Sequence, residues 1–270
     1  MPTGYVSLAS GQGDTPLAHA ETTHGNIRPI MHCAVVLTPM LCLLGCTHVP
    51  TDPEALADYR ANNDPAEPTN RAIFAGNQFV DRHVLQPVAR GYEDLPGRVR
   101  DSLHNFVSNL GQPAVAANDL LQANVRRAWN TTQRFAINTT LGGAGLFDVA
   151  TDWNRPAHKA DFGQTLGVWG IGTGPAVQLP LFGPSNVRDS IGQVVGLVTD
   201  PANFVPGSAA VTAVKTTSGT IGFVDTRANL LGTTDSLERT SVDDYAALRS
   251  AAAQRRAALV ADGKTGAVRD

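Results

Sequence analysis

A series of short amphipathic helical patterns, separated by glycine and proline, is the feature of this chain that most constrains its fold. Apolar residues recur every three or four positions, which is the spacing of an α-helix with one buried face. Gly111 and Pro113 are expected to end one such helix, because proline breaks a helix interior. The sequence therefore predicts an all-α fold, with helices over residues 69–85, 97–110, 113–122, 125–139, 162–169, 187–198 and 209–231, and a last helix that opens at Ser241.

Residues 170–185 interrupt this pattern with glycine and proline at short intervals around a small alternating apolar core. Such a segment is typical of either a loop or a short hairpin. The chain after Cys46 has no apolar run of the length, about 18 residues or more, that a spanning helix needs. We therefore expect the amphipathic helices either to form a soluble core or to lie in or against a membrane.

The three cysteines, Cys33, Cys42 and Cys46, all lie near the N-terminus, and none follows Cys46. This distribution excludes a disulfide-stapled domain and a zinc site built on paired thiolates in the rest of the chain. Residues 33–44 form an uncharged apolar run whose length fits the core of a secretory signal.

This apolar run ends in Leu43-Leu44-Gly45-Cys46, which resembles the lipobox of bacterial lipoproteins. The resemblance implies cleavage before Cys46 and acylation of its thiol, so residues 1–45 are interpreted as a signal sequence and residues 46–63 as a lipid anchor and tether. An ordinary signal peptide followed by a free thiol is the alternative. Residues 1–30 are polar and do not look like part of a signal, which makes Met31 a second candidate start. Thr47, by resemblance to sorted lipoproteins, favours the outer membrane.

Composition and motifs argue against several other functions. The net charge of -3 gives no reason to expect a nucleic-acid partner. The chain contains no H-E-x-x-H, G-x-S-x-G or Gly-Lys-Ser/Thr motif, so we expect no metal site, no cofactor and no catalytic residues. A triad could still assemble across the fold. The histidines available for one after Cys46 are His48, His83, His104 and His158.

Several short blocks of residues, spread in the family's order over residues 64–230, resemble the VacJ/MlaA family of outer-membrane lipoproteins. The first block is Asp64-Pro65-x-Glu67-x-x-Asn70-Arg71-x-x-Phe74, and Asp225-Thr226-Arg227-Ala228 is the last. Between them lie Asn105-Phe106-x-x-Asn109-Leu110, Pro113-Ala114-Val115, Asn118-x-Leu120-Leu121-Gln122, Arg134-Phe135-x-x-Asn138-Thr139, Gly145-Leu146-Phe147-Asp148-Val149-Ala150, Asp161-Phe162-Gly163-Gln164-Thr165-Leu166-Gly167, Gly172-x-Gly174-Pro175, Gln178-Leu179-Pro180, Pro184-Ser185 and Val187-Arg188-Asp189.

The resemblance implies a single disc-like, membrane-embedded helical domain, here residues 64–235, with residues 236–270 as a C-terminal helix and tail. It implies a lipoprotein, anchored at the periplasmic face of the outer membrane, that removes misplaced phospholipids from the outer leaflet and so maintains lipid asymmetry. Phospholipids, a soluble periplasmic phospholipid carrier and a trimeric porin are the implied partners, and no covalent chemistry is involved. A lipid-anchored structural protein and a periplasmic lipid-hydrolysing lipoprotein are the alternatives.

Within this family interpretation, some residues are candidates for a lipid path or for its gate. A lipid headgroup that crosses hydrocarbon needs polar side chains as partners. Asparagine amides also cap or satisfy backbone groups, and that alternative is equally open. Glycine and proline permit a hinged loop. The lipid-path candidates are Asn70, Phe74, Asn77 and Asn138, and the gate-loop candidates are Gly172, Gly174, Pro175, Pro180 and Gly183. The stretch Ala75–Phe79 departs from the more aromatic, asparagine-rich family pattern.

Overall fold

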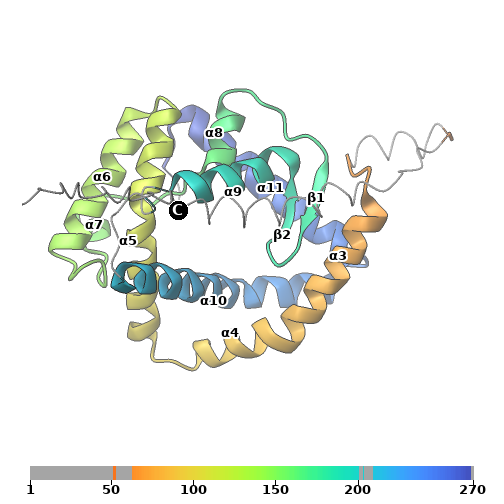
Figure 1. The fold of residues 1–270 in the computed structure, drawn as a ribbon, viewed down its shortest axis with the longest axis horizontal. Coiled ribbons are helices and arrows are strands. Elements are labelled where there is room, and N and C mark those ends of the chain that lie inside the picture. Colours follow the sequence, from red (N-terminus) through yellow and green to blue (C-terminus); the bar gives the residue numbers. More distant parts are fainter. Residues whose placement is uncertain (1–50, 53–62, 201–202, 204–208, 269–270) are drawn as a thin grey trace, which may run out of the picture. The chain divides into compact units, whose positions relative to one another are not determined.

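The computed structural model describes residues 51–52, 63–200, 203 and 209–268, all of which belong to one unit of the chain, residues 45–270. Cys46, the predicted signal sequence and most of the predicted tether lie outside the described residues. The elements of Figure 1 are α3 (Glu67–Val80), a π-helical turn η1 (Asp81–Leu85), α4 (Gln86–Glu93), α5 (Gly97–Leu121), α6 (Val125–Thr140), α7 (Val149–Asp152), α8 (Phe162–Val168), β1 (Ala176–Leu179), β2 (Gly183–Asn186), α9 (Val187–Thr199), α10 (Ala209–Thr240) and α11 (Asp244–Thr265).

Apart from one antiparallel hairpin, the regular elements in these ranges are helices, which confirms the all-α prediction. The hairpin pairs Ala176 with Asn186 and Leu179 with Gly183, so the hairpin alternative holds for residues 176–186. Helices α8, α9 and α11 pack together beside it, α5 packs along α6, and α10 packs on α4 and α5. No helix of the described ranges is at once long enough and apolar enough to cross a membrane.

The helix predicted over residues 69–85 is longer than expected. Helix α3, the turn η1 and α4 follow one another without interruption from Glu67 to Glu93 (Figure 1). Pro87 lies in the first turn of α4, directly after the wider π-helical turn. A π-helical turn shifts the hydrogen-bond pattern by one residue, which is one way a helix accommodates a proline.

The predicted break at Gly111 and Pro113 is wrong. Helix α5 runs through both residues as a single helix from Gly97 to Leu121. Its packing along α6 stabilises the helix although Pro113 removes one backbone donor, since tertiary contacts override local propensity. The two predicted helices over residues 97–110 and 113–122 are therefore one.

The C-terminal helices also differ from the prediction. Helix α10 continues to Thr240, so the expected boundary between residues 235 and 236 lies inside a helix. The last helix is capped by Asp243, whose side chain accepts a hydrogen bond from the backbone of Ala246. Ser241 instead bonds to the carbonyl of Leu237 at the end of the preceding helix and to Asp244. The serine thus joins the two helices and does not open the second one.

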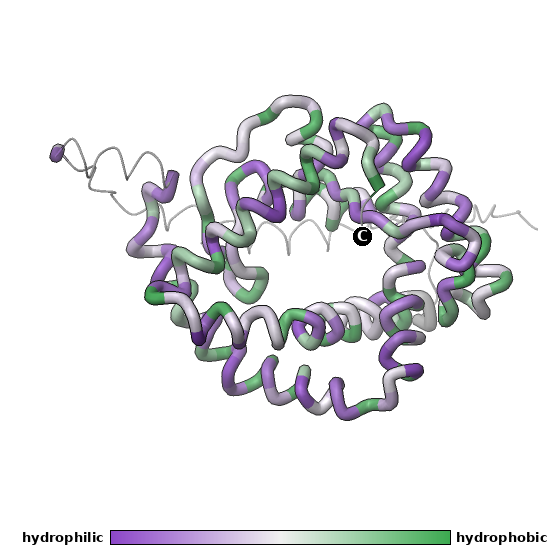
Figure 2. Tube along the Cα trace, turned by 180° about the vertical axis from the view of Figure 1, so that it is seen from behind, coloured by the Kyte–Doolittle hydropathy of each residue, from purple (hydrophilic) through white to green (hydrophobic). Residues whose placement is uncertain are grey.

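The interior of this unit is polar and much of its surface is apolar. The largest fully buried side chains are Arg127, Gln164, Thr131, Thr165 and Asp119. The buried apolar residues are mostly alanines, as in the small cluster of Ala89 and Ala228 with Leu231 between α4 and α10. In contrast, large apolar side chains on several helices and on the hairpin turn are exposed, among them Trp129, Phe147, Trp153, Trp169, Phe182 and Leu197. Figure 2 shows hydrophobic and hydrophilic residues interspersed along the helices.

Candidate functional site

The hairpin, which contains two of the five gate-loop candidates, is bound to α3 by two asparagines. Asn70 donates to the carbonyl of Ala176 (3.1 Å) and accepts from the backbone of Gln178 (2.9 Å). Asn77 donates to the carbonyl of Leu179 (2.8 Å) and accepts from the backbone of Leu181 (2.8 Å). Residues seven apart lie on one face of a helix. Helix α3 therefore presents two amides that pair with the hairpin backbone as a neighbouring strand would.

These bonds bear on the interpretation of the lipid-path candidates. The side-chain amides of Asn70 and Asn77 each donate one hydrogen bond to the hairpin backbone and accept one from it. This is expected if asparagines satisfy backbone groups. Phe74, between them in sequence, packs edge-on against Tyr245 of α11 with ring centroids 5.6 Å apart. The structure thus brings Asn70, Phe74 and Asn77 together along α3. A role for them in a lipid path stays a prediction.

Asn138, the fourth lipid-path candidate, belongs to a different cluster. Its side chain donates to Asp148 (2.9 Å) and accepts from the backbone of Ala150 (2.9 Å), which fixes the start of α7 against α6. Arg134 pairs with the same Asp148 at 2.8 Å. Burial acts to raise the pKa of Asp148, but hydrogen bonds from Thr151, Arg134 and Asn138 lower it below its usual value.

The gate-loop candidates fall into two groups. Gly172, Gly174 and Pro175 precede β1, while Pro180 and Gly183 flank the tip of the hairpin. Gly174 and Gly183 have left-handed backbone angles (φ 68° and 82°), which glycine adopts without strain. The carbonyl of Gly174 accepts from the Asn63 side chain (2.7 Å). The base and the tip of the hairpin are therefore tethered, whereas Gly170 and Gly172 have no side chain or distant backbone within 4 Å of a Cβ position.

Helices α3 and α11 are joined by a cluster that we call the α3–α11 clasp: Asp64, Arg71, Asp243, Tyr245 and Arg249. Asp64 is buried and accepts from the Tyr245 hydroxyl and from Arg249 (2.7 Å). Arg71 pairs with Asp243 at 2.6 Å and lies over the Tyr245 ring, 4.7 Å from its centroid.

The titration of the clasp follows from these contacts. The hydrogen bond from Arg71 lowers the pKa of Asp243 to about 2. Burial, with the neighbouring Asp64 carboxylate, raises the pKa of Tyr245. Both groups therefore keep a fixed protonation state at neutral pH, which suits a permanent joint between α3 and α11. The first block of the resemblance, from Asp64 to Phe74, supplies one half of this joint.

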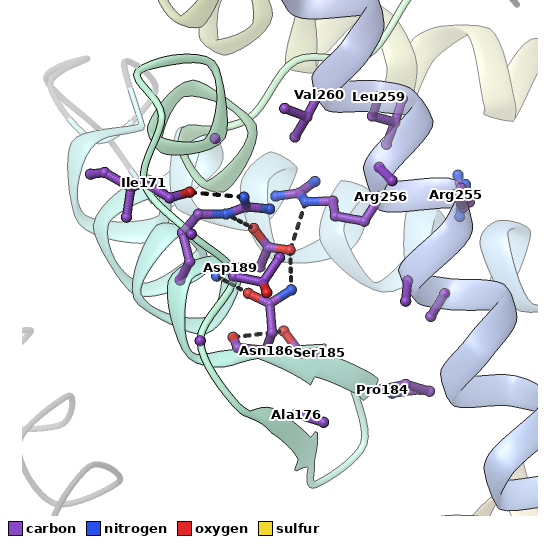
Figure 3. A pocket seen from close by; sticks show the side chains of 18 of the residues that line it. Ile171, Ala176, Pro184, Ser185, Asn186, Asp189, Arg255, Arg256, Leu259 and Val260 are labelled. Atoms are coloured by element: carbon purple, nitrogen blue, oxygen red, sulfur yellow. Dashed lines mark hydrogen bonds and ion pairs between the residues drawn. The ribbon is translucent and has the colours of Figure 1, made fainter. Parts of the chain in front are cut away.

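A cleft of about 1020 Å³ lies between the 170–174 loop, β2, the start of α9 and α11 (Figure 3). Asp189 of α9 accepts from Arg188 (2.8 Å) and from Arg256 of α11 (2.8 Å). Arg256 also pairs with Asp161 through both terminal nitrogens, at 2.6 Å each. Burial opposes ionisation of Asp189, yet the hydrogen bonds from Arg188 and Arg256 lower its pKa. The cleft thus has a charged, hydrogen-bonded floor that ties α8, α9 and α11 together.

Of the histidines in the part of the chain that the structure describes, His83 and His104 are exposed and His158 is buried. His83 is exposed and contacts the carbonyl of Phe79. His158 is buried with Asp119 (2.7 Å) and Thr131 (3.3 Å), where no substrate can reach it. His104 contacts Asp225 at 2.7 Å. That carboxylate also accepts from Tyr92, whose pKa is raised to about 12 by burial and by Asp225.

Sequence reasoning missed α11 as a source of site residues. Arg249 and Arg256 are seven positions apart and so share one helical face, which contributes to both the clasp and the cleft. The only signal in the sequence was the unusual density of arginine in an alanine-rich helix. Lys159 gave no signal, because it reaches the cleft from the short segment before α8, and Asp161 stood in a block of the resemblance without a role assigned to it.

Comparison with known proteins agrees with these observations. The model of the MlaA lipoprotein family matches residues 62–259, which extends into α11. The intermembrane phospholipid transport system lipoprotein MlaA of Escherichia coli K12 is 35% identical over 219 residues, 79% of this chain and 82% of that protein. A protein of Rickettsia bellii without an assigned function is 36% identical over 199 residues, 73% of this chain and 76% of that protein.

A solved structure described as "Structural basis for maintenance of bacterial outer membrane lipid asymmetry" has the same fold. It superposes with a TM-score of 0.63 at 33% identity, and the match covers 73% of this chain and 98% of that chain. The family match covers well over half of the sequence and includes the blocks that form the clasp and the hairpin contacts. The chain belongs to the MlaA lipoprotein family.

Proposed function

We propose that this protein is an outer-membrane lipoprotein that removes misplaced phospholipids from the outer leaflet and passes them to a periplasmic carrier protein. The observation that carries the proposal is the inverted polarity of the described unit. Arg127, Asp119 and Gln164 are fully buried, while Phe182 is 72% and Leu197 68% exposed. Exposed apolar side chains favour contact with acyl chains, and an interior held together by buried polar contacts suits a fold surrounded by hydrocarbon. The phospholipid transport lipoprotein of Escherichia coli to which this chain is similar supports the same role.

In this proposal the helices lie within the membrane without a spanning segment. Cys46 holds the protein at the periplasmic face of the outer membrane through its acyl chains, because two or more chains anchor a protein stably where one does not. The family resemblance further implies a trimeric porin as the partner in the membrane. Transport requires no covalent step, so the protein is not an enzyme.

The proposal is tested in a strain that lacks the gene. We expect outer-leaflet phospholipid and detergent sensitivity to rise in that strain and to return to normal with the wild-type copy. A Cys46→Ala copy should restore neither, because the unanchored protein is not held at the membrane. Unchanged outer-leaflet phospholipid in the deletion strain would favour a purely structural lipoprotein, and full rescue by Cys46→Ala would refute anchored transport.

The predicted gate, the loop Gly172–Gly183, is part of the proposal and has its own test at Gly174. A Cβ on Gly174 would lie 3.2 Å from the Cβ of Val187, close to the separation in a disulfide. The natural sequence has no thiol after Cys46, so Gly174→Cys with Val187→Cys introduces the only pair. We expect the oxidised double variant to lose transport and the reduced one to regain it, with Gly174→Cys alone as the control. Normal transport in the oxidised form would refute the gate.

Lipid hydrolysis predicts a different result. His104 is an exposed histidine with a carboxylate partner, Asp225, and is the group that a hydrolase would use. A His104→Gln copy should restore lipid asymmetry fully if transport involves no covalent chemistry. Loss of rescue by this copy in a normally folded protein, together with release of free fatty acid by the wild type, would support the hydrolase instead.

A further inference from the structure

The floor of the cleft contains an arginine that the fold positions without using all of its donors. The side chain of Arg188, at the start of α9, lines the cleft and is only 6% exposed. Its Nε donates to Asp189 (2.8 Å) and its Nη1 donates to the carbonyl of Ile171 (3.2 Å). Among the residues that the structure describes, the third nitrogen, Nη2, has no hydrogen-bond partner, yet it is not sealed from solvent. This donor is therefore available from the cleft.

The neighbouring arginine, Arg256 of α11, shows the contrast. Both of its terminal nitrogens donate to Asp161 at 2.6 Å, and its Nε lies 2.8 Å from Asp189. All three of its nitrogens are thus engaged by carboxylates of the protein. Arg188 and Arg256 share Asp189, but of the two only Arg188 keeps a donor for a ligand. An unused donor on a buried charged group costs free energy, which an anion in the cleft would recover.

The fold fixes the position of this guanidinium before any ligand binds. A Cβ on Gly167 of α8 would lie 2.8 Å from Nη1 of Arg188, so the group packs at a place that glycine leaves open. The Arg188 backbone donates to the carbonyl of Thr173 (3.0 Å), which ties the start of α9 to the 170–174 loop. An exposed arginine loses side-chain freedom when it binds a ligand, whereas this one is already ordered. Arg188 therefore differs from a mobile surface cation.

The rest of the cleft favours an anion that carries apolar groups. Its lining has two carboxylates against six cationic side chains: Lys159, Arg188, Arg249, Arg255, Arg256 and Lys264. Phosphate suits an arginine donor, because its oxygens accept strong, charge-assisted hydrogen bonds. The volume of about 1020 Å³ is far more than a phosphate ion fills, and Figure 3 shows Ile171, Leu259 and Val260 at the walls. A phosphate that is joined to acyl chains therefore fits this lining better than a free ion does.

We infer that Nη2 of Arg188 binds the phosphate group of a phospholipid headgroup in this cleft. The inference rests on the proposed function, for which it names the residue that holds the lipid. Asp189 and the carbonyl of Ile171 orient the guanidinium, and the apolar side chains at the walls contact the acyl chains. Free phosphate shares the recognised chemistry and is the alternative source.

The test uses the full chain purified in a non-ionic detergent and titrated calorimetrically with dihexanoyl phosphatidylglycerol. Arg188→Lys keeps the positive charge, but its single nitrogen cannot take the places of both Nε and Nη2. We expect it to weaken binding about tenfold or more, as for the loss of a charge-assisted hydrogen bond. Arg227→Lys is the matched control, because Asp81 binds two nitrogens of that arginine (2.6 and 2.7 Å) outside the cleft lining. It should change the affinity less than about twofold.

Two further ligands identify the recognised group. Dihexanoylglycerol has the acyl chains without the phosphate and should not bind measurably. Inorganic phosphate should compete, but with a lower affinity than the lipid, and an equal affinity would show that the lipid assignment is wrong. Unchanged lipid affinity in Arg188→Lys would mean that only the total charge of the cleft attracts the ligand. An equal loss in Arg227→Lys would mean that a weakened fold causes it, and either result overturns the site.

Folding and function are followed separately. If Arg188→Lys unfolds at a lower temperature than the wild type, Ala253→Trp tests the cleft with Arg188 unchanged, since Ala253 is exposed on α11 and lines the cleft. This variant should lose lipid binding, and unchanged binding would overturn the site. Rescue of the deletion strain by the wild type, with unchanged lipid binding in Arg188→Lys, would overturn only the site. Failure of the wild type to restore asymmetry would overturn the function itself.

Discussion

Two glycine-rich segments, residues 141–147 and residues 170–174, look alike in sequence but differ in the structure. In the first, a Cβ on Gly142 would overlap the carbonyl oxygen of Phe147 and lie 2.6 Å from that of Asn138. Gly145, with a φ of 93°, has the Asn109 side chain 2.6 Å from its Cβ position. In the second segment, Gly170 and Gly172 have nothing within 4 Å of theirs.

The difference shows two separate uses of glycine. In residues 141–147 it lets the backbone turn tightly against α6, and the carbonyls of Gly142, Gly143 and Leu146 accept hydrogen bonds. In residues 170–174, Gly170 and Gly172 leave open space beside the backbone, although the carbonyls of Ile171 and Thr173 accept from Arg188 and that of Gly174 accepts from Asn63. A segment with few side-chain contacts is the one expected to open at low free energy, which makes residues 170–172 the better place for a hinge.

The strongest test of this comparison is Gly142→Ala. The new methyl group would overlap backbone atoms, which cannot move aside as a flexible side chain can, so we expect the free energy of unfolding to fall by about 3 kcal/mol. The unfolding midpoint in detergent, followed by far-UV circular dichroism, measures the change. A midpoint equal to that of the wild type would mean that residues 141–147 are as open as residues 170–174.

The next largest effect is expected from Asn70→Ala. This substitution leaves the backbone of Gln178 and the carbonyl of Ala176 without their partner at a buried position, and it also removes the bond to Asp64. We expect a loss of about 2 kcal/mol. Asn77→Ala, the matched change two turns along α3, should cost less because its contacts are partly exposed to water. Faster hydrogen exchange of Gln178 and its neighbours in the Asn70 variant would identify the hairpin as the released part.

A smaller effect is expected from pH, through Asp148 at the end of the packed segment. Its pKa in the folded protein lies below the unfolded value of about 4. The carboxylate therefore stabilises the fold above that value, and the stabilisation is lost as the pH falls through the lower folded pKa. Unfolding midpoints of the wild type and of Asp148→Asn should differ at pH 7 and converge in acid. Parallel curves would contradict this role.

The smallest effect is expected from Gly172→Ala. The added methyl group meets no atom, and the alanine restricts the unfolded chain, so stability should be unchanged or rise by up to about 1 kcal/mol. Gly170→Ala is the contrast, because a φ of 92° strains an alanine even in open space. A marked loss of stability in Gly172→Ala would show that the 170–174 loop is packed after all.

Much of the fold was predictable because helical periodicity is a local property. The helices around Phe135 and Ile191 were located by their apolar residues at three- and four-residue spacing. The break at Pro113 was wrongly predicted because the packing of α5 along α6, which keeps the helix intact, is not visible locally. The same holds for Ser241, whose place between two helices depends on the end of α10.

The candidate site was predictable only in part, for a related reason. Asn70 and Asn77 were identifiable as a pair on one helix face, but their partners lie more than a hundred residues away in the hairpin. Asp161 and Arg256, which pair in the cleft, come from separate elements and have no shared pattern in the sequence. Spacing reveals residues on one face of one helix, and it does not reveal what the chain folds onto that face.

The polar interior has a consequence for the solvent in which the fold persists. In water, burial of large apolar side chains usually supplies most of the stability, and that contribution disappears when the surroundings are hydrocarbon. Here the buried links between elements are hydrogen bonds and ion pairs, such as Arg127 with Asp119 and Gln122 with Thr165. Such links strengthen as the local dielectric constant falls. The same architecture that would be weakly held as a water-soluble protein is therefore suited to acyl chains as its solvent.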